Sequence, residues 1–124
     1  MNKLDHKKIE SMDYHESYEV LGGVIRNLGD GWFFIEDDVH QMIGIKEITQ
    51  DNEKVIIKYS EKNKVISTTV TVDETMAAEG YTVGASVGKG ETWIFIYDKY
   101  NNLINPSEYK NAMGNIWIHG IFKR

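Results

Sequence analysis

The sequence contains no cysteine, which excludes disulfide bonds, thiolate metal sites and a cysteine nucleophile. No apolar run approaches the roughly 20 residues that a membrane-spanning helix needs. The N-terminal segment also lacks the apolar core of a secretory signal peptide. We therefore expect a protein that is made in a reducing cytoplasm and has no membrane span.

Basic residues are fewer than acidic ones, 14 against 19, and the formal net charge at pH 7 is -5. Short basic clusters such as Lys7-Lys8 and Lys123-Arg124 lie beside acids or at a terminus, where they are best interpreted as solvated surface. Binding nucleic acid through phosphate contacts requires a basic stripe that displaces counterions. The composition therefore predicts no nucleic-acid partner.

The length of 124 residues predicts one domain, large enough to form a core without metal or disulfide bonds. Residues 1–16 are polar, and their apolar positions are too sparse to form a helix face. They predict an N-terminal arm, either a simple tail or a segment that contacts another subunit. Residues 17–124 predict the folded domain.

Short segments rich in β-branched and aromatic residues recur through residues 17–124, separated by turn signals about every 8–12 residues. Gly22-Gly23 predicts a bulge or bend, and the polar loop 60–63 has hairpin length. Residues 73–80 begin with acids and stop at glycine, which predicts one short helical turn. The pattern predicts an all-β fold: a single-domain antiparallel β-sandwich or small barrel of seven to nine short strands.

Residues 84–88 match the G-x-S-x-G pattern of a hydrolase nucleophile elbow. That motif requires a strand, a strained turn and a helix within a large parallel sheet. Here a strand follows instead, so we interpret the segment as a glycine-kinked β segment. Ser86 is not expected to be a nucleophile. The weakest hypothesis is accordingly a small hydrolase that uses Ser86.

Residues 36–40 gather three carboxylates and an imidazole, but lack the alternating pattern and the glycine pivot of a calcium loop. A charged turn is the better interpretation. None of the histidines has the spacing of a zinc site, and His119, on a predicted strand, is expected to be half-buried and hydrogen-bonded. The histidines are His6, His15, His40 and His119. The sequence predicts no catalytic residue, no metal site and no cofactor.

The aromatic residues fall into two groups. Trp32, Trp93 and Trp117 lie among aliphatic residues in predicted strands, so we expect all three in the core. Tyr97, Tyr100 and Tyr109 flank an Asn-rich turn and loop. An exposed tyrosine there could stack on a sugar, become buried in a subunit interface, or have no partner.

The C-terminal half carries an ordered set of motifs. A helical turn at 73–80 is followed by the glycine-rich 84–88, by Trp-Ile-Phe-Ile-Tyr-Asp, by an Asn-Asn turn and by Ile-Asn-Pro. The segment 115–124 then ends the chain as a strand, in which Trp117 and Phe122 are expected to be core residues. Across roughly residues 64–124 this order resembles small β domains of phage and prophage tail proteins, which close on an Asn-Ile-Trp-x-x-Gly-x-Phe type strand.

The resemblance implies a non-enzymatic virion component, made in the cytoplasm of a bacterial host, that belongs to a tail fibre or baseplate. It implies a homo-oligomer, commonly a trimer, that contacts other tail proteins and uses no cofactor. The alternative hypothesis is a carbohydrate-binding module that recognises cell-surface or cell-wall glycans through tyrosine and tryptophan side chains.

Overall fold

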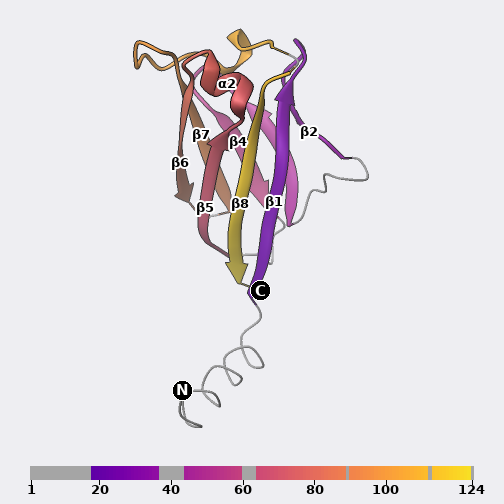
Figure 1. Cartoon of the computed structure of the whole chain (residues 1–124). Coiled ribbons are helices and arrows are strands. Elements are labelled where there is room, and N and C mark those ends of the chain that lie inside the picture. Colours follow the sequence, from indigo (N-terminus) through magenta and orange to yellow (C-terminus); the bar gives the residue numbers. More distant parts are fainter. Residues whose placement is uncertain (1–17, 37–43, 60–63, 89, 112, 124) are drawn as a thin grey trace.

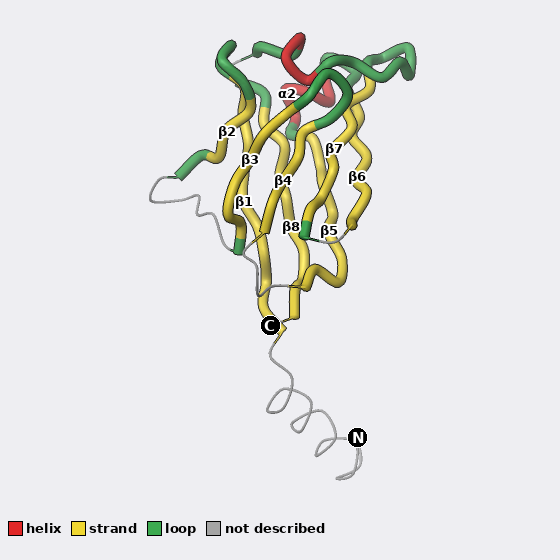
Figure 2. The backbone as a smooth tube through the Cα atoms, turned by 180° about the vertical axis from the view of Figure 1, so that it is seen from behind, coloured by secondary structure: helices red, strands yellow, loops and turns green. Residues whose placement is uncertain are grey.

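Alternating apolar and polar residues build two four-stranded antiparallel sheets that pack face to face (Figures 1 and 2). The computed structural model describes residues 18–36, 44–59, 64–88, 90–111 and 113–123. The arm expected at residues 1–16 lies outside these ranges. Within them, no helix is long and apolar enough to span a membrane.

The first sheet, called sheet A, has the strand order β2-β1-β8-β5, and the second, sheet B, has the order β3-β4-β7-β6. The strands of sheet A are β2 (Trp32–Phe34), β1 (Tyr18–Asn27), β8 (Asn115–Lys123) and β5 (Lys64–Val72). Those of sheet B are β3 (Ile45–Gln50), β4 (Val55–Tyr59), β7 (Glu91–Tyr97) and β6 (Thr82–Gly88). Eight strands in two antiparallel sheets confirm the predicted all-β sandwich.

The core lies between the sheets and is built from every second residue of the central strands. In sheet A, Ile25 faces Ile116 across the β1–β8 pair, and both side chains are fully buried. In sheet B, Val55 of β4 is opposite Ile94 of β7, and both are again fully buried. Since the period of a strand is two, the intervening residues of β7 must point away from the core. This alternation places Trp93 on the outer face of sheet B.

The predicted helical turn is confirmed as α2 (Glu74–Ala78), which connects β5 of sheet A to β6 of sheet B at one end of the sandwich (Figure 1). The Asp73 side chain caps the helix, because its Oδ1 accepts a hydrogen bond of 3.0 Å from the Met76 amide. Its Oδ2 accepts a second bond, of 2.8 Å, from the amide of Asn115. Gly80 then has a φ of 87°, as expected of a glycine that ends a helix.

The same end of the sandwich is closed by the segment that follows β7, which includes the 3₁₀ helix η1 (Pro106–Glu108). The carbonyl oxygen of Pro106 accepts hydrogen bonds from Trp32 Nε1 at 2.9 Å and from Asn27 Nδ2 at 3.3 Å. Asn27 and Trp32 are both buried, so these bonds satisfy donors that water does not reach. The closing segment is therefore attached to sheet A.

Two local predictions were wrong. The segments 54–59 and 64–72 do not form a hairpin, because β4 pairs with β3 and β7 while β5 pairs with β8 in the other sheet. The loop 60–63 itself lies outside the described residues. Gly22-Gly23 forms no bulge, since β1 pairs with β8 in continuous register through both positions. Close packing explains the glycines: a Cβ on Gly22 would lie 3.1 Å from the carbonyl oxygen of Ile118, and one on Gly23 would lie 3.1 Å from the Phe34 ring.

Candidate functional site

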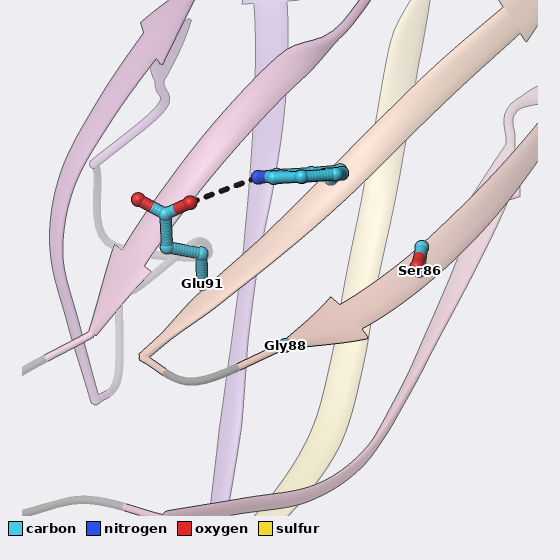
Figure 3. A pocket seen from close by; sticks show the side chains of 4 residues that line it. Ser86, Gly88 and Glu91 are labelled. Carbon is cyan, nitrogen blue, oxygen red and sulfur yellow. Dashed lines mark hydrogen bonds between the residues drawn. The ribbon is translucent and has the colours of Figure 1, made fainter.

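Trp93 lies at the centre of a surface site on the outer face of sheet B. Figure 3 shows this site from close by, with Ser86, Gly88 and Glu91 labelled. Its side chain is 40% exposed, although its neighbours Thr92 and Ile94 are fully buried. On the adjacent edge strand β6, Ser86 is directly opposite Trp93. Glycines lie on both sides of Ser86 on the same face, at positions 84 and 88. The small residues of β6 leave one side of the indole uncovered.

The indole of Trp93 is fixed by two charged neighbours. Its Nε1 donates a hydrogen bond of 2.9 Å to Oε1 of Glu91, two residues earlier on β7 (Figure 3). The Nζ atom of Lys54 lies 4.7 Å from the ring centroid, within the range of a cation–π interaction. The ring is therefore held in one orientation before any ligand arrives, which reduces the entropy lost on binding.

Lys54 is itself held by Asp51, whose Oδ2 lies 2.8 Å from Nζ. The hydrogen bond from the Lys54 side chain and the amide of Glu53 lower the pKa of Asp51 to about 2. The same bond to Asp51 raises the pKa of Lys54. The cation beside the indole therefore remains charged across the physiological pH range.

Trp93, Glu91, Ser86 and Gly88 line a surface depression of about 300 Å³. It presents an aromatic face, a carboxylate and a hydroxyl, side by side on two paired strands. An aromatic face buries apolar C–H groups of a ligand, while a carboxylate accepts hydrogen bonds from hydroxyl groups. This combination suits a small polyhydroxylated ligand. The four side chains supply the groups that binding such a ligand requires.

The structure separates the three tyrosines proposed as contact residues. Tyr100 is 73% exposed at the tip of the turn after β7, and Lys99 Nζ lies 5.2 Å from its ring centroid. Tyr97 is partly buried at the end of β7, on the same outer face as Trp93 and about 13 Å further along the strand. Asn101 takes a φ of 64° in this turn, a conformation that asparagine tolerates better than most residues.

Tyr109 requires a correction, because it is only 2% exposed and cannot contact a ligand or another subunit. Its ring stacks on Trp32 at a centroid distance of 5.7 Å and meets the edge of Tyr81 at 4.8 Å. The hydroxyl is buried and has no hydrogen-bond partner among the described residues. Burial is the main cause that raises the pKa of Tyr109, and nearby Glu79 adds to it.

The other candidate residues are placed as follows. Ser86 lies inside strand β6, which pairs in register with β7, so residues 84–88 form a β segment as expected and not the turn of a nucleophile elbow. His119 is exposed on β8, contrary to the half-buried state expected. The acidic positions 37–38 and His40 lie outside the described ranges. No group of metal-ligating side chains is found among the described residues.

The expectation that all three tryptophans belong to the core was right only for Trp32, which is 5% exposed. Trp93 and Trp117 are 40% and 46% exposed, on the outer faces of the two sheets. Strand period explains both errors, since each tryptophan lies between two buried residues and must point outward. A search for apolar strand residues that alternate with the predicted core residues would have found both tryptophans.

Comparison with known proteins adds no relatives: the chain matches no protein-family model, no curated protein and no solved structure. The likeness to phage tail domains therefore remains a prediction from the order of motifs in the sequence.

Proposed function

We propose that this domain is a non-enzymatic structural component of a phage or prophage tail, in a tail fibre or baseplate, and that it assembles as a homo-oligomer. The ordered motifs of residues 64–124 support the proposal. These motifs occupy the consecutive elements β5, α2, β6, β7, η1 and β8. The terminal segment of that set is an interior strand, with β1 on one side and β5 on the other.

The observation that carries the proposal is a group of exposed apolar side chains on the outer face of sheet A. Trp117 and Ile121 of β8 are 46% and 42% exposed there, and Phe33 of β2 is 37% exposed. The outward residues from 67 to 71 and from 115 to 121 include no Asp, Glu, Lys or Arg. In a chain with 27% charged residues, such a face is the one best suited to burial against a neighbouring tail protein.

Incorporation into particles tests this proposal. The source bacterium would express either the wild-type chain or one variant. Phage particles would then be purified by density gradient and probed with an antibody against the chain. We expect Ile121→Lys to lower incorporation roughly tenfold, because it places a charge among the exposed apolar side chains of this face. Tyr100→Lys, a charge on an exposed residue away from this face, is the control. Absence of the wild-type chain from particles would refute the proposal.

Glycan recognition is the second candidate function, and the Trp93 depression favours it. The fixed indole offers a flat apolar surface, and the Glu91 carboxylate and Ser86 hydroxyl lie beside it for sugar hydroxyl groups. Tyr97, at the other end of β7, and Tyr100, in the turn that follows it, could contact a further part of a long glycan. A tail domain with such a site would bind the bacterial surface.

A glycan array followed by calorimetry tests this second function. We expect saturable binding of one glycan class that falls at least about tenfold in Trp93→Ala, as is usual when an aromatic anchor is removed. Tyr100→Ala should change the affinity less, and Tyr109→Phe should not change it, because that ring is buried. Binding that survives Trp93→Ala would exclude this depression as the site.

A further inference from the structure

A row of aromatic side chains runs along the outer face of β7. Its members, Trp93, Phe95 and Tyr97, alternate with three fully buried residues of the same strand. Trp93 is 40% exposed, and the other two rings are partly exposed. Residues two apart on a strand are separated by about 6.6 Å, so the row is about 13 Å long. The depression at Trp93 is therefore one end of a longer aromatic surface, which we call the β7 aromatic row.

Small residues of β6 line one side of the β7 aromatic row. Gly84 is opposite Phe95, and Ser86 is opposite Trp93, in the register of the two strands. A Cβ added to Gly84 or to Gly88 would meet no atom within 4 Å, so open space lies above the strand at both positions. Figure 3 shows the Ser86 and Gly88 end of β6 beside β7. The open space next to the row therefore continues from the depression towards Phe95.

Larger side chains line the other side of the row. Ile56 of β4 is opposite Trp93, and Leu103, which follows β7, is opposite Tyr97. Leu103 is 44% exposed, and Lys54 Nζ lies over one face of the indole. A ligand that lies against the aromatic rings is therefore confined to the side of β6. There it meets a trough whose floor is the β6 backbone and whose wall is the aromatic row, called the β6 trough below.

The charge of the trough restricts the kind of ligand. Within β6 and β7 the one charged residue is Glu91, at one end of the row. The nearby cations Lys54 and Lys58 belong to the β4 side of the row. An acidic polymer in the trough would bring further negative charge beside Glu91, which disfavours binding. The trough therefore suits an uncharged ligand.

The chemistry of the trough favours a sugar chain over a peptide. An extended peptide binds by adding a strand to a free sheet edge. The β6 backbone pairs with β7 on one side, and β5 lies against its other side, so the trough is a sheet face and not an edge. A pyranose ring offers a flat apolar C–H face to an aromatic ring and hydroxyl groups to Ser86 and Glu91.

We propose that the β6 trough binds a linear, uncharged glycan that lies parallel to β7, with one sugar ring against each of Trp93, Phe95 and Tyr97. The inference rests on the glycan recognition proposed above and specifies the shape, charge and direction of the ligand. The affinity should increase with chain length up to three sugars, because the second and third sugars bind without a further loss of translational freedom.

Calorimetry with two series of neutral linear oligosaccharides tests the length dependence. Cello-oligosaccharides and chito-oligosaccharides of one to five sugars are the probes, and hyaluronan oligosaccharides of matching length are the charged comparison. For at least one neutral series, we expect the affinity to rise at least about tenfold from one sugar to three, and little beyond that. Hyaluronan should bind at least about tenfold more weakly. Affinity that does not depend on length, or no binding of either neutral series, would overturn the inference.

Two variants test the position of the glycan along β7. Phe95→Ala should lower the affinity for the three-sugar ligand at least about fivefold. Phe33→Ala, which removes an exposed ring from sheet A, is the matched control and should leave that affinity unchanged. Gly84→Leu should lower the affinity at least about tenfold by filling the trough. It should not lower the melting temperature, because no atom lies within 4 Å of its Cβ position.

The results separate this inference from glycan recognition itself. Binding that is lost in Trp93→Ala but survives Phe95→Ala or Gly84→Leu would overturn the extended site and retain the Trp93 depression as a glycan site. If the glycans bound on the array are all branched or charged, the conclusion is the same. An array on which the wild-type chain binds no glycan would overturn both.

Discussion

The Tyr109 hydroxyl occupies the space that a side chain at residue 114 would need. A Cβ built on Gly114 would overlap that hydroxyl and come within 2.9 Å of Cγ of Met76. Met76 belongs to α2 and is fully buried, and Gly114 directly precedes β8. The absence of a side chain at Gly114 therefore lets the closing segment, the short helix and the central strand of sheet A meet in one place.

Gly114→Ala should destabilise the domain by about 3 kcal/mol, the upper part of the usual range for overpacking a core. The added methyl group meets a buried ring and a buried methionine, neither of which has free space to move into. Gly84→Ala is the matched control, because nothing lies within 4 Å of its Cβ position. Urea denaturation of both variants measures the difference, and equal midpoints would contradict the packing described here.

The two buried tyrosines should respond oppositely to loss of their hydroxyl groups. Tyr109→Phe should stabilise the domain by about 1 kcal/mol, because it removes a buried hydroxyl that has no hydrogen-bond partner among the described residues. Tyr59→Phe should destabilise it by about 1 kcal/mol, because the Tyr59 hydroxyl is hydrogen-bonded to Thr92 and lies 3.4 Å from Oγ1 of Thr68. Thermal melting shows whether each variant has a higher or lower melting temperature than wild type. A shift in the same direction for both variants would refute the argument.

The pKa of Asp51 should depend on its hydrogen bond to Lys54. In the folded protein its pKa is about 2, against a usual 3.8, so its contribution to stability is present above about pH 4. That contribution is lost as the pH falls through the folded pKa. In Lys54→Met we expect the pKa of Asp51, measured by NMR titration of its carboxyl carbon, to rise towards 3.8. Lys58→Met, which removes a charge within β4, should leave the pKa of Asp51 unchanged.

Truncation after Gly114 should unfold the domain. Strand β8 lies between β1 and β5, so its removal leaves both without their shared partner and exposes Ile25 and Val70 of the core. Circular dichroism should show the loss of a cooperative thermal transition. A synthetic peptide of residues 115–124 added in excess should restore it by strand addition. An unchanged transition in the truncated chain would show that β8 is dispensable.

Local structure was largely predictable from residue type. Asp73 as a helix cap, Gly80 as its terminator and Asn101 in a left-handed turn all follow from preferences that act within a few residues. Strand positions followed equally well from runs of β-branched and aromatic residues. These features depend on nothing far away in the chain.

The partners of each strand were not predictable in the same way. Strand β5 follows β4 after a loop of hairpin length, yet it crosses to the other sheet and pairs with β8. The outward placement of Trp93 and the burial of Tyr109 depend on this arrangement. The candidate site was missed because Trp93 has apolar neighbours on both sides, so its outward position emerges only when its phase in the strand is compared with that of the core residues.

The pairing of the earliest described strand with the last sets the order of events during synthesis. Tyr18 of β1 pairs with Lys123 of β8, and among the described strands β5 pairs with β8 alone. Sheet A therefore cannot form until residues 115–123 have left the ribosome. Sheet B, complete in sequence by Tyr97, can assemble earlier but has no second layer to cover it. We expect nascent chains of this protein to depend on chaperones until β8 has emerged from the ribosome.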